Sequence, residues 1–107
     1  MNQTLTSNKE LATEILSQLG GRQFLAMTGC KNLVYDHNSL TMKLVPNRSK
    51  AKYLQIVLNE WDTYNLIFFT VNKQTGERTY KQDVRGIYCD NLRMVFENET
   101  GLYTKLF

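Results

Sequence analysis

The fold is decided by residues 40–71, LTMKLVPNRSKAKYLQIVLNEWDTYNLIFFTV. Apolar side chains occupy alternate positions in 40–44 and again in 54–58, which is the period of a strand with one buried face. The run 63–71 is apolar on both faces, as expected near the centre of a sheet covered by helices. Because a proline-containing loop and the turn NEWD separate these runs, the segment predicts three consecutive antiparallel strands.

Shorter segments on both sides extend this sheet. Residues 31–35, KNLVY, and the polar turn DHNS at 36–39 predict a hairpin with the strand that begins at Leu40. After the loop NKQTGER, residues 79–84, TYKQDV, predict a short polar strand at a sheet edge. The apolar run QFLAMT, residues 23–28, is too brief for an isolated helix and is predicted to be the first strand, with an extension of the helical layer as the alternative.

Helices are predicted at both ends of the chain. Ser7 and Glu10 fit a capping box, apolar residues at helical spacing follow, and Gly20 or Gly21 can end this first helix. Near the C-terminus, residues at helical spacing precede a second stop at Gly101; they are Tyr88, Leu92, Val95 and Phe96. The last apolar residues are expected to pack back on the core; they are Leu102, Tyr103, Leu106 and Phe107.

These elements predict one α+β domain over residues 1–107. It consists of an antiparallel sheet of four to five strands in a meander, flanked by an N-terminal and a C-terminal helix. A chain of 107 residues with 42% hydrophobic residues is long and apolar enough for a single core.

Composition also limits the compartment and the class of partner. The net charge is only +3, which permits an anionic partner without requiring one. No stretch reaches the ~18 apolar residues of a membrane helix, and no signal peptide is visible, so a cytoplasmic protein without membrane contact is expected. Cys30 and Cys89 lack any zinc-ligand spacing and are predicted to be small buried hydrophobes, so no metal or other cofactor is expected.

The sequence holds no enzyme motif, and we expect no catalytic residue. Residues 29–32, GCKN, lack the Gly-Lys-Ser/Thr step of a Walker loop. Thr28, Gly29 and Lys31 leave a looser anion site open, with a tight turn as the alternative. His37, the only histidine, stands among turn-forming residues rather than beside a nucleophile.

Two sets of residues are candidates for binding. A basic set surrounds the proline-containing loop: Lys43, Arg48, Lys50 and Lys52. It would neutralise phosphates in a small nucleic-acid-binding module, or else it only keeps a sheet edge solvated. An aromatic set is predicted to contact a protein: Trp61, Tyr64 and Tyr53. For Trp61, the alternative is that its ring closes the end of the core.

The order of short motifs also resembles a known group. LGG at 19–21, MTGCKN at 27–32, the pattern L..WD.Y...F at 58–68 and TGLYT at 100–104 resemble small uncharacterised proteins of bacteriophages and integrated mobile elements. The likeness covers about residues 13–106. It implies a phage or mobile-element origin and a bacterial host cytoplasm, and it brings no catalytic residue.

The resemblance shapes the functional expectation. We expect a non-catalytic accessory protein, monomer or homodimer, that binds a host or phage protein and inhibits, for example, a bacterial defence factor; the alternative is the nucleic-acid-binding module. The chain departs from the family pattern at Cys30, where alanine is usual, and at Trp61. Neither side chain is therefore expected to be a functional group shared by the family.

Overall fold

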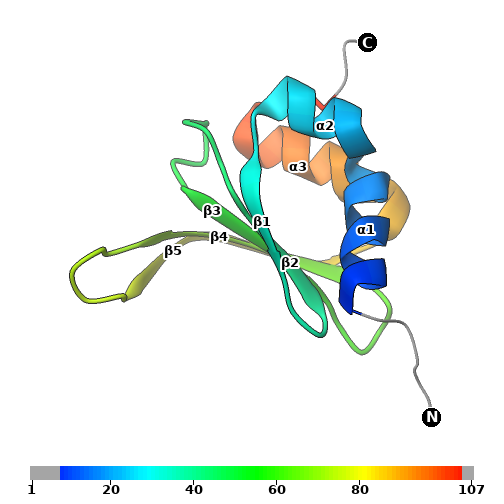
Figure 1. The fold of residues 1–107 in the computed structure, drawn as a ribbon, viewed down its shortest axis with the longest axis horizontal. Coiled ribbons are helices and arrows are strands. Elements are labelled where there is room, and N and C mark those ends of the chain that lie inside the picture. Colours follow the sequence, from blue (N-terminus) through cyan, green and yellow to red (C-terminus); the bar gives the residue numbers. More distant parts are fainter. Residues whose placement is uncertain (1–7, 105–107) are drawn as a thin grey trace.

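A five-stranded sheet and three helices build the protein, whose structure is a computed structural model that describes residues 8–104 (Figure 1). In chain order, the elements are α1 (Asn8–Leu19), α2 (Gly21–Thr28), β1 (Lys31–Tyr35), β2 (Ser39–Lys43), β3 (Tyr53–Leu58), β4 (Tyr64–Val71), β5 (Arg78–Ile87), the short 3-10 helix η1 (Cys89–Asn91) and α3 (Leu92–Thr100). The strands are antiparallel and lie side by side in sequence order. This confirms the predicted α+β meander with a helix at each end.

The strand register gathers the alternating apolar residues on one face of the sheet. In two neighbouring rows no side chain is more than 2% exposed: Leu40, Ile56 and Leu66 form one row, and Met42, Leu54 and Phe68 form the other. A slip of one residue would turn a whole strand's apolar set toward solvent, so burial of this face fixes the register of β2, β3 and β4.

The three helices lie on this buried face (Figure 1). Leu11, Ile15 and Leu19 recur every four residues along α1 and form its buried stripe. Phe24 of α2 and Phe96 of α3 meet edge to face with ring centroids 4.9 Å apart, and neither is exposed. The molecule measures 23 Å along its shortest axis, which fits one layer of helices on one sheet.

Residues 23–28 belong to α2, so the prediction of a first strand there is wrong. Phe24 and Thr28 are both buried, and their separation of four residues is that of one helix face. The Thr28 hydroxyl donates to the Phe24 carbonyl oxygen at 2.7 Å. An eight-residue helix is unstable alone, so the packing of Phe24 against Phe96 decides its conformation.

The other face of the sheet carries no helix from residues 8–104, which corrects the expectation that helices cover both faces of β4. Phe69 on this open face is still only 2% exposed, because neighbouring side chains cover it. Tyr53 stacks on it at 5.5 Å between centroids, Tyr80 lies 6.3 Å away, and the Arg78 guanidinium carbon lies 4.3 Å from its ring centre. We call Tyr53, Phe69, Arg78 and Tyr80 the aromatic cluster.

β5 is longer than the predicted strand 79–84, but it forms a sheet edge as expected. The hairpin of β4 and β5 projects beyond the helices (Figure 1), and most residues of β5 are therefore exposed. The edge strand thus offers side chains to solvent along most of its length.

The predicted helix ends are confirmed, because α1 and α3 stop directly before Gly20 and Gly101. Tyr88, predicted to lie in the C-terminal helix, instead has an extended backbone and precedes η1, so that prediction is wrong. Of the C-terminal apolar residues, Leu102 packs against the core as expected, whereas Tyr103 is 73% exposed. Three residues with a predicted role lie outside the described part of the chain: Ser7, Leu106 and Phe107.

The two cysteines have opposite environments. Cys30 is buried as predicted, but Cys89 is exposed at the start of η1, which corrects its prediction as a buried hydrophobe. Burial raises the pKa of the Cys30 thiol, and a hydrogen bond with Thr28 offsets part of this rise.

Thiol labelling should report this difference. With an aromatic disulfide reagent near neutral pH, we expect Cys89 to react roughly 100-fold faster than Cys30, because the thiolate is the nucleophile and Cys30 is both shielded and less ionised. Raising the pH toward the raised pKa of Cys30 should speed up its labelling and so lower the ratio of the Cys89 rate to the Cys30 rate. Cys89→Ser should remove the fast phase and Cys30→Ser should leave it; a fast phase that survives in Cys89→Ser would contradict the assignment.

Candidate binding surfaces

The turn between α2 and β1 does not form the anion site that the sequence left open. The Thr28 hydroxyl donates to Phe24 and accepts the backbone N–H of Cys30 at 3.3 Å. The Gly29 N–H is donated to the Leu25 carbonyl oxygen at 3.0 Å. Two of the three groups proposed to hold an anion, the Thr28 hydroxyl and the Gly29 N–H, are thus satisfied internally. Only Lys31 is left of that candidate set, and the segment is the tight turn of the alternative interpretation.

The histidine also lies in a turn, between β1 and β2. Its Nδ1 atom is 3.1 Å from an Asp36 carboxylate oxygen, and both side chains are largely exposed. The backbone N–H of His37 donates to the same oxygen, and this bond lowers the pKa of Asp36. Within residues 8–104, no group of three or more His, Cys, Asp or Glu residues is placed to hold a metal ion.

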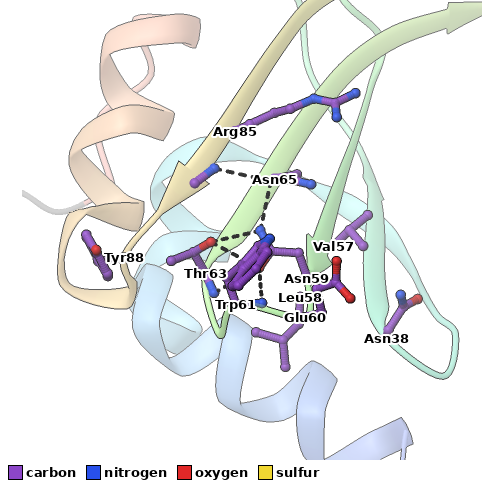
Figure 2. A pocket seen from close by; sticks show the side chains of 11 residues that line it. Asn38, Val57, Leu58, Asn59, Glu60, Trp61, Thr63, Asn65, Arg85 and Tyr88 are labelled. Carbon is purple, nitrogen blue, oxygen red and sulfur yellow. Dashed lines mark hydrogen bonds between the residues drawn. The ribbon is translucent and has the colours of Figure 1, made fainter.

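Trp61 lies in the turn between β3 and β4 and is 77% exposed, so it does not close the end of the core. The Asn59 side-chain oxygen accepts the backbone N–H of Trp61 at 2.9 Å and that of Thr63 at 3.2 Å. The Asn59 amide donates to the Thr63 hydroxyl at 2.8 Å and to the Asn65 side-chain oxygen at 3.1 Å (Figure 2). This network fixes the backbone from which the indole projects.

An open hollow of about 780 Å³ lies beside Trp61 (Figure 2). Arg85 of β5 and Tyr88, which follows that strand, line the same hollow, and Tyr88 is 64% exposed. The Arg85 guanidinium lies 2.9 Å from an Asp83 carboxylate oxygen, which raises the pKa of the arginine. We call Trp61, Arg85, Tyr88 and the hollow between them the tryptophan end.

The other two aromatic candidates lie elsewhere. Tyr64 is 4% exposed in the core, at an inward position of β4 opposite Ile87, and burial raises its pKa. It therefore has almost no surface to offer a partner, and its assignment as a contact residue is corrected. Tyr53 is half-buried in the aromatic cluster, at the end of β3 opposite to the Trp61 turn.

Three of the four basic candidates come together. Lys43, Lys50 and Lys52 line one pocket of about 420 Å³, and Lys73 from the loop between β4 and β5 joins them. Its apolar lining comes from Leu44, Val45, Pro46 and Ala51. We call this site the lysine pocket.

Arg48, the fourth basic candidate, stabilises a helix instead. Its guanidinium donates to the carbonyl oxygens of Glu97 at 3.4 Å and Asn98 at 2.5 Å, and its backbone N–H donates to Thr100 at 2.9 Å. These carbonyls belong to the last turn of α3, where helical partners are missing and positive charge is favourable. Arg48 is therefore a helix cap and does not line the lysine pocket.

Neither a search for membrane-spanning helices nor comparisons with known proteins identify a further site. No helix in the described part of the chain is long and apolar enough to cross a membrane. A comparison with protein-family models, curated proteins and solved structures finds no match. The chemistry of the tryptophan end, the lysine pocket and the aromatic cluster therefore rests on their own geometry.

Proposed function

We propose that the protein is a non-catalytic accessory protein of a phage or mobile element that binds a host or phage protein through the tryptophan end. The observation that carries the proposal is the 77% exposure of Trp61 on a turn fixed by Asn59. Tryptophan, tyrosine and arginine dominate the binding energy of protein interfaces, and the tryptophan end brings one of each to a single hollow.

The local structure suits an interface in two further respects. A turn that is ordered before binding loses less conformational entropy on association. Glu60 lines the hollow and Asp62 directly follows Trp61 in the chain, so the indole has an acidic neighbour on each side in the sequence. We therefore expect a partner that accepts the indole in a pocket and surrounds it with basic residues.

The biological part of the proposal follows from the resemblance to phage and mobile-element proteins. A small binding protein without enzyme motifs acts by occupying the surface of its target, and inhibition of a bacterial defence factor is such an action. Because the region 58–68 resembles the family but departs from its usual pattern at Trp61, we expect recognition of this partner to be particular to this chain.

Trp61→Ala is expected to weaken partner binding about 30-fold, which corresponds to about 2 kcal/mol for an interface hot spot. The melting temperature should stay nearly unchanged, because the side chain is exposed. The immobilised protein captures the partner from a lysate of the bacterium that carries the gene, and titration calorimetry then gives both affinities.

Tyr103→Ala is the matched control, because Tyr103 is 73% exposed but does not line the hollow. We expect it to retain the partner with wild-type affinity. The proposal fails if the wild-type protein retains no stoichiometric partner, or if Trp61→Ala and Tyr103→Ala lower the affinity equally.

A further inference from the structure

The lysine pocket adjoins the aromatic cluster at one end of the sheet. Lys43 lies opposite Tyr53 in the pairing of β2 with β3, Tyr53 lies opposite Phe69, and Phe69 lies opposite Tyr80. A single row across four strands thus leads from a lysine of the pocket into the aromatic cluster. From this juxtaposition we infer that the open face binds single-stranded nucleic acid, at a site separate from the tryptophan end.

The aromatic cluster provides flat surfaces for unpaired bases. Tyr80 is 61% exposed, Tyr53 is half-buried, and the Arg78 guanidinium lies against the Phe69 ring. Bases stack on tyrosine rings and on guanidinium planes regardless of their identity. Since Tyr53 and Tyr80 stand two strands apart, about 10 Å, each has room for its own base.

The lysine pocket provides the matching charge for a phosphate backbone. Its four lysines come from two separate loops and the end of β2, so they surround the pocket rather than follow one strand. Glu77 and Asp83 are the acidic side chains nearest in sequence to the cluster, and Asp83 is already paired with Arg85. Among the described residues, four lysines and Arg78 thus face one unpaired acidic residue, Glu77, so positive charge prevails at this end of the sheet.

The combination of the aromatic cluster with the lysine pocket favours single-stranded nucleic acid over other anionic partners. A duplex keeps its bases stacked on each other and would leave the tyrosines unused. An acidic protein surface would also pair with the lysines, but flat tyrosine rings beside a group of lysines match the bases and phosphates of a single-stranded nucleic acid more closely. Glu60 and Asp62 at the far end of the sheet would repel phosphates, so the nucleic acid is expected to bind at the end that carries the lysine pocket.

Fluorescence anisotropy with labelled oligothymidylate and oligouridylate of about 12 nucleotides tests this inference. The wild-type protein should bind with an affinity that falls as the salt concentration rises. The double variant Lys43→Ala/Lys52→Ala should bind at least about tenfold more weakly, and its affinity should depend less steeply on salt. Tyr80→Ala should lower the affinity for the oligonucleotide at least about fivefold because it removes a stacking surface, while Tyr80→Phe should retain wild-type affinity. Binding of either oligonucleotide supports the inference, and the two distinguish DNA from RNA.

Lys9→Ala/Arg22→Ala is the charge-matched control, because it removes two positive side chains from exposed positions of α1 and α2. It should change the affinity less than about twofold, and so should Trp61→Ala, which separates this inference from the proposed protein contact. Absence of binding at low salt, equal affinity for a duplex of the same length, or an unaltered affinity in Tyr80→Ala would overturn it.

Discussion

Phe96→Ala is expected to lower the free energy of unfolding by about 3–5 kcal/mol, which is the usual cost of deleting a buried phenylalanine. The Phe96 ring is fully buried and meets Phe24 at 4.9 Å, so alanine would leave a cavity where α2, α3 and the sheet converge. The total free energy of unfolding of a small domain is only about 5–15 kcal/mol, so the variant should unfold at a much lower urea concentration than the wild-type protein. Circular dichroism across a urea titration measures the shift.

Met94→Ala in the same helix is the control for this prediction. Met94 is 53% exposed, and its replacement should change the stability by less than about 0.5 kcal/mol. Combining Phe24→Ala with Phe96→Ala in a double-mutant cycle should give a coupling energy of about 0.5–1.5 kcal/mol for the ring pair. A loss below about 1 kcal/mol in Phe96→Ala would contradict full burial of the ring, because the lost transfer free energy of a buried phenylalanine exceeds this value even when the site collapses without a cavity.

The sequence predicted those elements of the fold that depend on local patterns and failed where a distant contact, such as that of Phe24 with Phe96, decides the structure. In β2 and β3, burial of every second residue is a local pattern, and it predicted both the strands and their buried face. Residues 23–28 are too few for a periodic signal, and a contact with Phe96, far along the chain, makes them helical. Phe69 likewise suggested a second layer of helices, but Tyr53, Tyr80 and Arg78 cover it instead.

The candidate sites follow the same division between local and distant signals. Trp61 was identifiable because a tryptophan in a polar turn is a local feature. Arg85 was missed and Tyr88 was predicted to lie in the C-terminal helix, because only the pairing of β4 with β5 brings both residues to the hollow. Arg48 was grouped with the lysines by sequence proximity, whereas its partners lie about fifty positions further along, in α3.

Lys73, Arg78 and Tyr80 were missed for the same reason as the residues of the hollow. They follow β4, the second strand after the lysine-rich loop, and no spacing in the sequence relates them to Lys43. The meander brings them to one end of the open face. Sequence proximity therefore predicted the loop contribution to this surface, and the sheet supplied the remainder.

Gly29→Ala is expected to lower the free energy of unfolding by about 2–5 kcal/mol, the second largest effect. Gly29 ends α2 with φ +71°, a left-handed conformation that costs an alanine about 1–2 kcal/mol. A β-carbon at this position would also lie 2.9 Å from Cγ1 of Val45, and such overpacking typically costs about 1–3 kcal/mol. Urea titration of the purified variant measures the sum.

Gly76→Ala separates the two contributions to this loss. Gly76 has a similar φ of +76°, but an added β-carbon would meet no atom within 4 Å, so only the conformational cost of about 1–2 kcal/mol applies. In a Val45→Ala background, which removes Cγ1, the cost of Gly29→Ala should fall to that of Gly76→Ala. If both glycine variants lose the same stability in the wild-type background, contact with Val45 does not account for the requirement for glycine, and the left-handed turn alone explains it.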